Sequence, residues 1–280
     1  MPQTKQTSWN LPQDPKYHDW SKALLQAQIG QDPQLDPYLV CNADYLINLD
    51  TIAIYEFQKE PLLGKYKSVI LDAKQGIVLS KRSTCALFTA YGRQCLLGGI
   101  EFQRELASKL QLQSQCVIAT GKVAFFSMHA YTAGNNDWIA LQQMRDFDLD
   151  GRLRIIFKSL KYNQIAYTFS FSNCSRYIGT KVCDGLYYNH VIFELGKRYL
   201  EELSGWQVKT AASDSMIDQQ AFFMPHPTFE HLSLQQLSSD LLNKQHLRYG
   251  QQLAAYYELT FVIKDHQTIY GLSKRRDTFF

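Results

Sequence analysis

Short apolar runs alternate with turn signals between residues 45 and 82, a pattern that is typical of β-strands. The runs are YLINL at 45–49, TIAIYEF at 51–57, YKSVILD at 66–72 and GIVLS at 76–80. Turn-forming residues, namely Pro61, Gly64 and Gly76, separate them. The pattern therefore predicts consecutive strands in this part of the chain.

Residues 84–112 change to helical spacing. Leu97, Ile100, Leu106 and Leu110 can share one face of a helix, while the charged residues fall largely on the other face. Glycine weakens a helix interior, so Gly98-Gly99 is expected to divide the segment into two helices.

Residues 116–139, CVIATGKVAFFSMHAYTAGNNDWI, contain two strand-like runs on either side of Gly121. A polar turn follows, and the segment ends on Trp138-Ile139. This order predicts two strands, a long connection and a buried aromatic anchor. Two further strands are expected at 152–160 and 164–178, joined as a hairpin by the turn at 161–163.

The C-terminal half favours helices. One helix is predicted at 185–206, where Gly205 is the stop signal, and another at 229–259. A strand-like LTFVI follows at 259–263. The predicted fold class is α+β, with a mixed, mainly antiparallel sheet, packed helices and a helical C-terminal part.

Four segments are expected along the chain. Residues 1–40 are rich in Gln, Asp and Pro and are predicted to be an N-terminal extension or flexible arm, whose one amphipathic patch, Trp20–Ile29, can dock on the body. The α+β core is placed at 41–206, a partner-docking segment and helix at 207–250, and a C-terminal extension at 251–280.

Composition limits the class of protein. The chain has 280 residues, of which 45% are hydrophobic, so it can bury a sizeable core. It has neither the N-terminal layout of a signal peptide nor an apolar stretch long enough for a membrane span, which predicts a soluble cytoplasmic protein. The six cysteines form no Cys-x-x-Cys pair, so free thiols are expected and neither a metal nor a cofactor is predicted.

Charge is segregated along the chain, although the net charge is only +3. Residues 61–127 carry nine Lys/Arg against three Asp/Glu, and residues 152–198 carry eight against two. Between them, residues 128–151 carry one against four. Aromatic residues are interleaved with the second basic block, and basic groups among aromatics suit a nucleic-acid surface. The alternative is that these charges are the solvated outer faces of strands.

Catalytic motifs are missing from the sequence. It contains no phosphate-binding Gly-rich loop and no G-x-S-x-G motif. A Cys–His nucleophile pair made of Cys116 and His129 is conceivable, but such a His is more often a packing residue. Asp146, Asp148 and Asp150 lack the remaining ligands of an EF-hand and are interpreted as a solvated acidic turn. No catalytic residue is predicted.

Residues 221–227, AFFMPHP, form an apolar segment in a region with little regular patterning. Such a segment either packs into the protein's own core or is presented to a partner. Both alternatives stay open at this stage.

Four motifs, in chain order, resemble the ComK family of competence transcription factors. They are YLINLDTIAI at 45–54, RSTCALFTAYGR at 82–93, the 116–139 segment and QQAFFMPHP at 219–227, which a predicted helix follows. The resemblance covers roughly residues 45–250. Within it, Ser127-Met128 stands where the family has Pro-Thr, and Asn136-Asp137 stands at the family's Cys position.

The resemblance implies a non-enzymatic, nucleoid-associated transcription activator of DNA-uptake genes. It would bind double-stranded AT-rich boxes through the minor groove as a homo-oligomer and act on RNA polymerase. By the same resemblance, the adaptor MecA would dock a Clp protease on Phe222, Phe223, Met224 and Pro225.

Candidate DNA-binding residues come from the two basic blocks, because minor-groove readers use Lys and Arg. They are Lys81, Arg82 and Arg93 in the first block, and Arg152, Arg154, Lys158, Arg176 and Lys181 in the second. Two other functions are kept as alternatives: a protein-interaction module that uses AFFMPHP, and an enzyme that uses Cys116 or His129.

Overall fold

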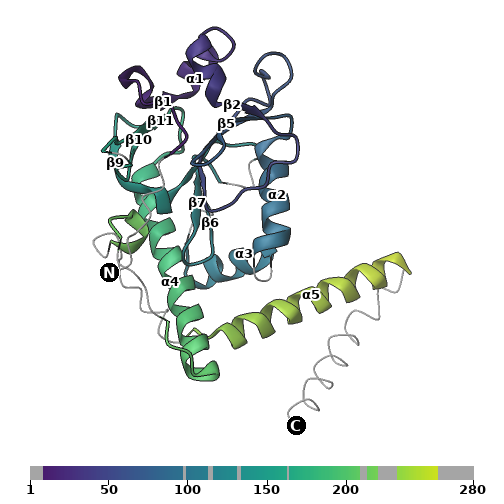
Figure 1. The fold of residues 1–280 in the computed structure, drawn as a ribbon. Coiled ribbons are helices and arrows are strands. Elements are labelled where there is room, and N and C mark those ends of the chain that lie inside the picture. Colours follow the sequence, from purple (N-terminus) through teal and green to yellow (C-terminus); the bar gives the residue numbers. More distant parts are fainter. Residues whose placement is uncertain are drawn as a thin grey trace. The chain divides into compact units, whose positions relative to one another are not determined.

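A computed structural model describes residues 9–96, 99–112, 116–130, 134–162, 164–208, 213–219 and 232–257. The chain divides into two compact units, Met1–His231 and Leu232–Phe280, and each is described by itself. Figure 1 shows strands and packed helices in the first unit. Among the described strands, only β1–β11 and β2–β5 pair in parallel, so the predicted mixed, mainly antiparallel α+β class is confirmed.

The larger sheet of the first unit has seven strands. In spatial order they are β2 (Leu39–Cys41), β5 (Gly76–Ser80), β4 (Ser68–Asp72), β3 (Thr51–Glu56), β8 (Trp138–Ala140), β7 (Ala124–Ser127) and β6 (Val117–Ala119). Every residue of β4, β5, β7 and β8 is buried, as expected for strands covered on both faces.

The smaller sheet has four strands in the order β1 (Asp19–Ser21), β11 (Thr168–Phe171), β10 (Ile155–Ser159) and β9 (Met144–Leu149). Strands β10 and β11 form the antiparallel hairpin that the turn at 161–163 predicts. The aromatic rings of Tyr55 in β3 and Phe171 in β11 stack with centroids 5.0 Å apart. This contact joins the two sheets.

Helices cover the two faces of the larger sheet. Helix α2 (Thr84–Cys95) lies over the face that carries Ile54, Phe125 and Trp138, and the helix α3 (Gly99–Lys109) follows it. On the opposite face, Gly185 of α4 (Ile178–Ser204) lies against Phe126 and Val117. Figure 1 shows α2 and α4 on opposite sides of β6 and β7. The predicted division of residues 84–112 into two helices is confirmed.

Helix ends follow local capping chemistry. The Ser83 hydroxyl accepts the Ala86 N–H at 3.3 Å where α2 begins. Gly205 ends α4 with a φ of 66°, a left-handed conformation that glycine adopts without strain. In the second unit, Ser233 caps α5 (Leu234–Tyr256) in the same way as Ser83 caps α2. Helix α4 begins seven residues earlier than its predicted start at 185.

The predicted N-terminal extension at residues 1–40 is wrong for its described part, which begins at Trp9. Trp20 and Leu25 of the predicted docking patch are fully buried, but Tyr17 and Leu35 outside it are buried as well, and strands β1 and β2 are edge strands of the two sheets. This part also contains α1 (Lys22–Gln28) and the 3₁₀ helices η1 (Pro15–Tyr17) and η2 (Pro33–Tyr38). The segment is part of the core because most of its large apolar side chains, although sparse, are buried.

Two other local predictions are wrong. The predicted acidic turn at 146–150 is mostly strand β9, whose outward side chains are acidic because this edge strand faces solvent. The predicted strand at 45–49 is a loop. The predicted strand at 259–263 lies outside the described residues.

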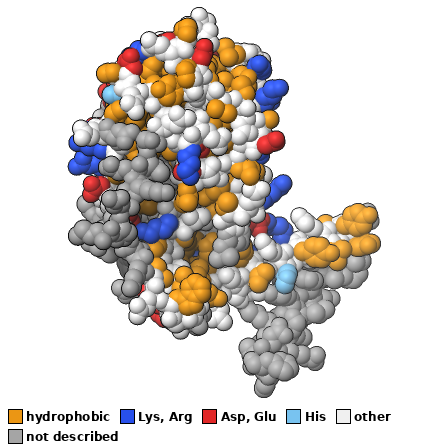
Figure 2. All heavy atoms as spheres, viewed as in Figure 1, with side chains coloured by type: hydrophobic (Ala, Val, Ile, Leu, Met, Phe, Trp, Pro, Cys, Tyr) orange, Lys and Arg blue, Asp and Glu red, His pale blue; other side chains and the backbone are white. Residues whose placement is uncertain are grey.

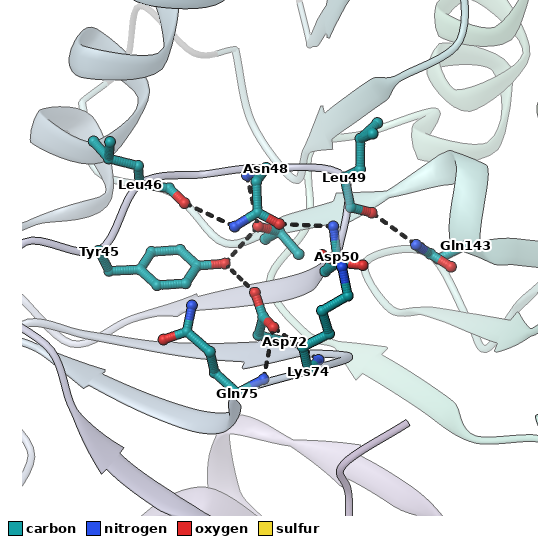
Figure 3. A network of polar contacts seen from close by, with 10 residues as sticks. Tyr45, Leu46, Asn48, Leu49, Asp50, Asp72, Lys74, Gln75 and Gln143 are labelled. Carbon is teal, nitrogen blue, oxygen red and sulfur yellow. Dashed lines mark hydrogen bonds and ion pairs between the residues drawn. The ribbon is translucent and has the colours of Figure 1, made fainter. Parts of the chain in front are cut away.

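The loop at residues 45–49 has no strand partner, and hydrogen bonds from side chains hold it in place, as Figure 3 shows. The buried Tyr45 hydroxyl donates to the Asp72 carboxylate at 2.7 Å, and the same carboxylate accepts the N–H groups of Lys74 and Gln75 at 2.9 Å. Burial, followed by the Asp72 charge, raises the pKa of Tyr45. Gln143 donates to the Leu49 carbonyl at 2.9 Å. The loop is therefore fixed without strand pairing.

Candidate nucleic-acid interface

Part of the first basic block lies near the open end of the β4–β5 hairpin. The Lys67 N–H donates to the Ser80 carbonyl at 2.9 Å, and the Ser68 hydroxyl donates to the Arg82 carbonyl at 2.7 Å. These bonds place Lys67 beside Lys81 and Arg82, and Lys65 lies two residues before Lys67 in the chain. We call these four residues the hairpin cluster. No carboxylate of the described chain forms an ion pair with them.

Arg82 holds the hairpin cluster in place. Its guanidinium is half-buried and donates to the carbonyls of Tyr45 at 3.4 Å and Ala86 at 3.0 Å. Its charge remains at the surface, but its side chain is bound to the backbone between β5 and α2. Lys81, by contrast, is exposed and can extend toward a partner.

Arg93 does not belong to the hairpin cluster. It is exposed in the last turn of α2, nine residues after the first residue of the helix, or about 14 Å along its axis. Figure 2 shows basic side chains along the edge of the first unit on the side where α2 lies, at the right of the view. Arg93 and the hairpin cluster therefore lie at opposite ends of one helix.

The second basic block is partly neutralised. The Arg154 guanidinium lies 2.8 Å from the Asp150 carboxylate, and the Lys158 ammonium lies 2.5 Å from the Asp148 carboxylate. Lys158 can reach Asp148 because β10 lies beside the acidic β9, with Asp148 opposite Ile156. Asp150 and Arg154 face each other across the turn between the two strands. Exposed ion pairs of this kind stabilise a fold by about 0–1 kcal/mol each, but they cancel charge toward a distant polyanion.

The other members of the second block lie around the start of α4. Arg152 and Arg176 are exposed and line the same cavity. Lys181 is half-buried, and its N–H makes a hydrogen bond to the Tyr177 carbonyl at 3.1 Å. The structure thus divides the eight candidates among the hairpin cluster, the end of α2, the β9–β10 pair and the start of α4.

Lys65 and Lys67 were not among the sequence candidates. The hairpin register pairs Ser68 with Ser80, so Lys67 must lie beside Lys81, and Lys65 is two residues before Lys67. Counting across the predicted hairpin could have found them, because cross-strand neighbours are fixed by register.

The segment with Phe222, Phe223, Met224 and Pro225 lies outside the described residues. Of the alternative enzyme pair, Cys116 is buried at 2% exposure, and the Ser127 hydroxyl donates to the backbone carbonyls of both Cys116 and His129. Neither residue lines the cavity around Arg152 and Arg176 or the smaller one around Arg145 and Tyr162. In the same part of the chain, no three acidic, His or Cys side chains gather as a metal site.

The pKa of the half-buried Asp137 carboxyl is clearly shifted from its usual value. Burial raises its pKa to about 6, against the lowering effect of the Glu56 N–H, which it accepts at 2.6 Å, and of Lys22. Because the folded protein holds this proton more tightly than the unfolded chain, the contribution to stability is full below about pH 4 and is lost as the pH rises through 6.

The Asp137→Asn variant is expected to be more stable than wild type at pH 7, by about 1–2 kcal/mol, because the amide keeps the acceptor oxygen and carries no charge. Urea unfolding at pH 4.5, 5.5 and 7 should show the gain growing as the pH rises. If the free energies of unfolding of the two proteins changed in parallel with pH, the pKa of Asp137 would not be raised in the folded protein.

Comparison with known proteins gives no relative. The chain matches no protein-family model, no curated protein and no solved structure. The similarity to the ComK family therefore stays a prediction from the four motifs. No helix in the described ranges has an apolar stretch long enough to cross a membrane.

Proposed function

We propose that this protein is a DNA-binding transcription activator related to the ComK family, with the hairpin cluster as its main phosphate contact. The observation that carries the proposal is the gathering of Lys65, Lys67, Lys81 and Arg82 without a carboxylate partner within the described chain. Unpaired cations gain most from phosphate contact because they release counterions from DNA without first breaking an ion pair.

The cationic groups lie on separate parts of the first unit. The hairpin cluster belongs to the larger sheet, whereas Arg152 and Arg176 lie near the smaller sheet and α4. We therefore expect several copies of the chain to assemble along an AT-rich duplex, with Lys and Arg side chains at its narrow minor groove. Recruitment of RNA polymerase, and docking of MecA with a Clp protease on Phe222–Pro225, belong to the same proposal and rest on the motifs alone.

A gel-shift titration of AT-rich against GC-rich duplexes of equal length tests the proposal. The AT-rich duplex should bind more tightly, and a drug that occupies the minor groove should displace the protein. Equal affinity for the two duplexes, or binding that the drug leaves unchanged, would overturn the minor-groove part of the proposal. No binding by the folded protein at low salt would overturn DNA binding itself.

A further inference from the structure

A cavity of about 840 Å³ lies between the β9–β10 turn and the start of α4. This volume is within the range of pockets that hold small organic ligands. The walls come from three places in the chain: the end of β9 and the turn after it, the residues just before α4, and the first turn of α4. All three lie in the first unit.

Two unpaired arginines line this cavity. Arg152 and Arg176 are both exposed, and no ion pair with a described carboxylate involves either of them. Arg154, two residues from Arg152, is instead paired with Asp150 at 2.8 Å. The positive charge of this region is therefore concentrated at the cavity, and guanidinium groups bind carboxylate and phosphate oxygens in a fork geometry.

The remaining wall is apolar and open to solvent. Leu149 is 55% exposed, Leu153 is 45% exposed and Tyr177 is 81% exposed, and all three line the cavity. Exposed apolar side chains beside a cavity gain free energy when a ligand covers them, by about 25 cal/mol for each Å² removed from water. A simple inorganic anion would leave this surface uncovered.

The start of α4 adds hydrogen-bond donors to the same wall. The helix has no side-chain cap at Tyr177, and Ile178, Gly179 and Thr180 of its first turn line the cavity. The N–H groups at the start of a helix have no acceptor within the helix, so they favour a negative group nearby. Gly179 lies close to Leu149, where an added Cβ would stand 3.1 Å from the leucine methyl, so strand and helix are held together here.

We propose that this cavity binds a small organic anion, namely a phosphate or carboxylate attached to an apolar or aromatic body. The charged group lies between Arg152 and Arg176, and the body covers Leu149, Leu153 and Tyr177. This site is separate from the hairpin cluster, and the inference does not rest on DNA binding.

Calorimetric titration of the full chain with phenyl phosphate tests the site, with inorganic phosphate and phenol as the two halves of the probe. Phenyl phosphate should bind saturably and at least about tenfold more tightly than either half. The Arg152→Ala/Arg176→Ala variant should lose at least about tenfold in affinity, whereas Arg154→Ala should stay within about twofold of wild type. Leu153→Ser should weaken phenyl phosphate but not inorganic phosphate.

Three results would overturn the inference. The first is that the folded wild type shows no saturable binding of phenyl phosphate up to about 10 mM. The second is that the double-arginine variant binds phenyl phosphate as tightly as wild type does. The third is that inorganic phosphate binds as tightly as phenyl phosphate. Near-ultraviolet circular dichroism of each variant confirms that the comparison is between folded proteins. A parallel DNA titration separates the two proposals, because failure to bind DNA while phenyl phosphate still binds overturns the proposed function alone.

Discussion

A chain that begins at residue 42 is expected not to fold. The removed part contributes six large side chains with at most 1% exposure: Leu11, Tyr17, Trp20, Leu25, Ile29 and Leu35. It also contributes the edge strands β1 and β2 of the two sheets. Loss of one buried large side chain costs about 2–5 kcal/mol, while the net stability of a protein is about 5–15 kcal/mol. Removing all of them together exceeds that margin.

Circular dichroism and thermal melting of the 42–280 chain measure this effect. The spectrum should lose its near-ultraviolet signal, and the cooperative melting transition should disappear. As a control, a peptide of residues 1–41 added to the truncated chain should restore part of the signal by supplying β1 and β2. A truncated chain that melts cooperatively within a few degrees of wild type would show that the segment is a dispensable arm.

Trp138→Ala is expected to produce the largest loss of stability of any single substitution in β8. The indole is 3% exposed and stacks on Phe88 of α2, with ring centroids 3.7 Å apart and planes inclined by 23°. Trp138 pairs with Ile54 in β3 and Ser127 in β7, so it lies on an interior strand of the larger sheet. Truncating such a residue costs about 3–5 kcal/mol, because the cavity left behind collapses only partly.

Urea unfolding measures this loss, with Trp206→Ala as the matched control. Trp206 is 66% exposed, so its removal should change the free energy of unfolding by no more than about 0.5 kcal/mol. A Trp138→Ala chain that loses less than about 1 kcal/mol would contradict the role of this indole as the anchor between α2 and the larger sheet.

Strong periodic patterns made much of the fold predictable. The strands β3, β4 and β5 and the break between α2 and α3 follow from apolar runs and glycines that act locally. The buried position of Trp138 also follows from its place after a polar turn. In each case the local sequence of the element is sufficient to determine its structure.

Features that depend on distant contacts were not predictable. Strand β1 has only three residues and forms because β11, far along the chain, offers it an edge. The 45–49 loop has the composition of a strand, but the Tyr45 hydroxyl bonds to Asp72 and Gln143 bonds to Leu49. Such tertiary contacts override local propensity.

The candidate interface was predictable only in part. Charge counting along the chain locates both basic blocks, but it cannot separate paired from unpaired cations. Lys158 and Arg154 share a block with Arg152, and only the pairing of β9 with β10 and the turn between them show that the first two are ion-paired. Lys67 is recognised as a neighbour of Lys81 only from the register of β4 against β5, and Lys65 lies two residues before Lys67.

Two triple variants that change the net charge equally distinguish the contribution of the hairpin cluster to DNA binding from that of other surface lysines. The first removes the unpaired lysines Lys65, Lys67 and Lys81. The second removes three lysines that are already ion-paired, Lys16 with Asp32, Lys74 with Asp50 and Lys122 with Asp218. Each variant lowers the net charge by the same amount, so a difference between them reports position rather than total charge.

The salt dependence of binding to an AT-rich duplex, measured by fluorescence anisotropy for wild type and both variants, is the most direct test of DNA binding through the hairpin cluster. Each phosphate contact contributes about 0.9 to the slope of log affinity against log salt concentration. We predict that the unpaired-lysine variant lowers this slope by about 2–3 and that the paired-lysine variant lowers it by less than about 1. Equal slopes for the two variants, or no salt-dependent binding by wild type, would contradict DNA binding through the hairpin cluster.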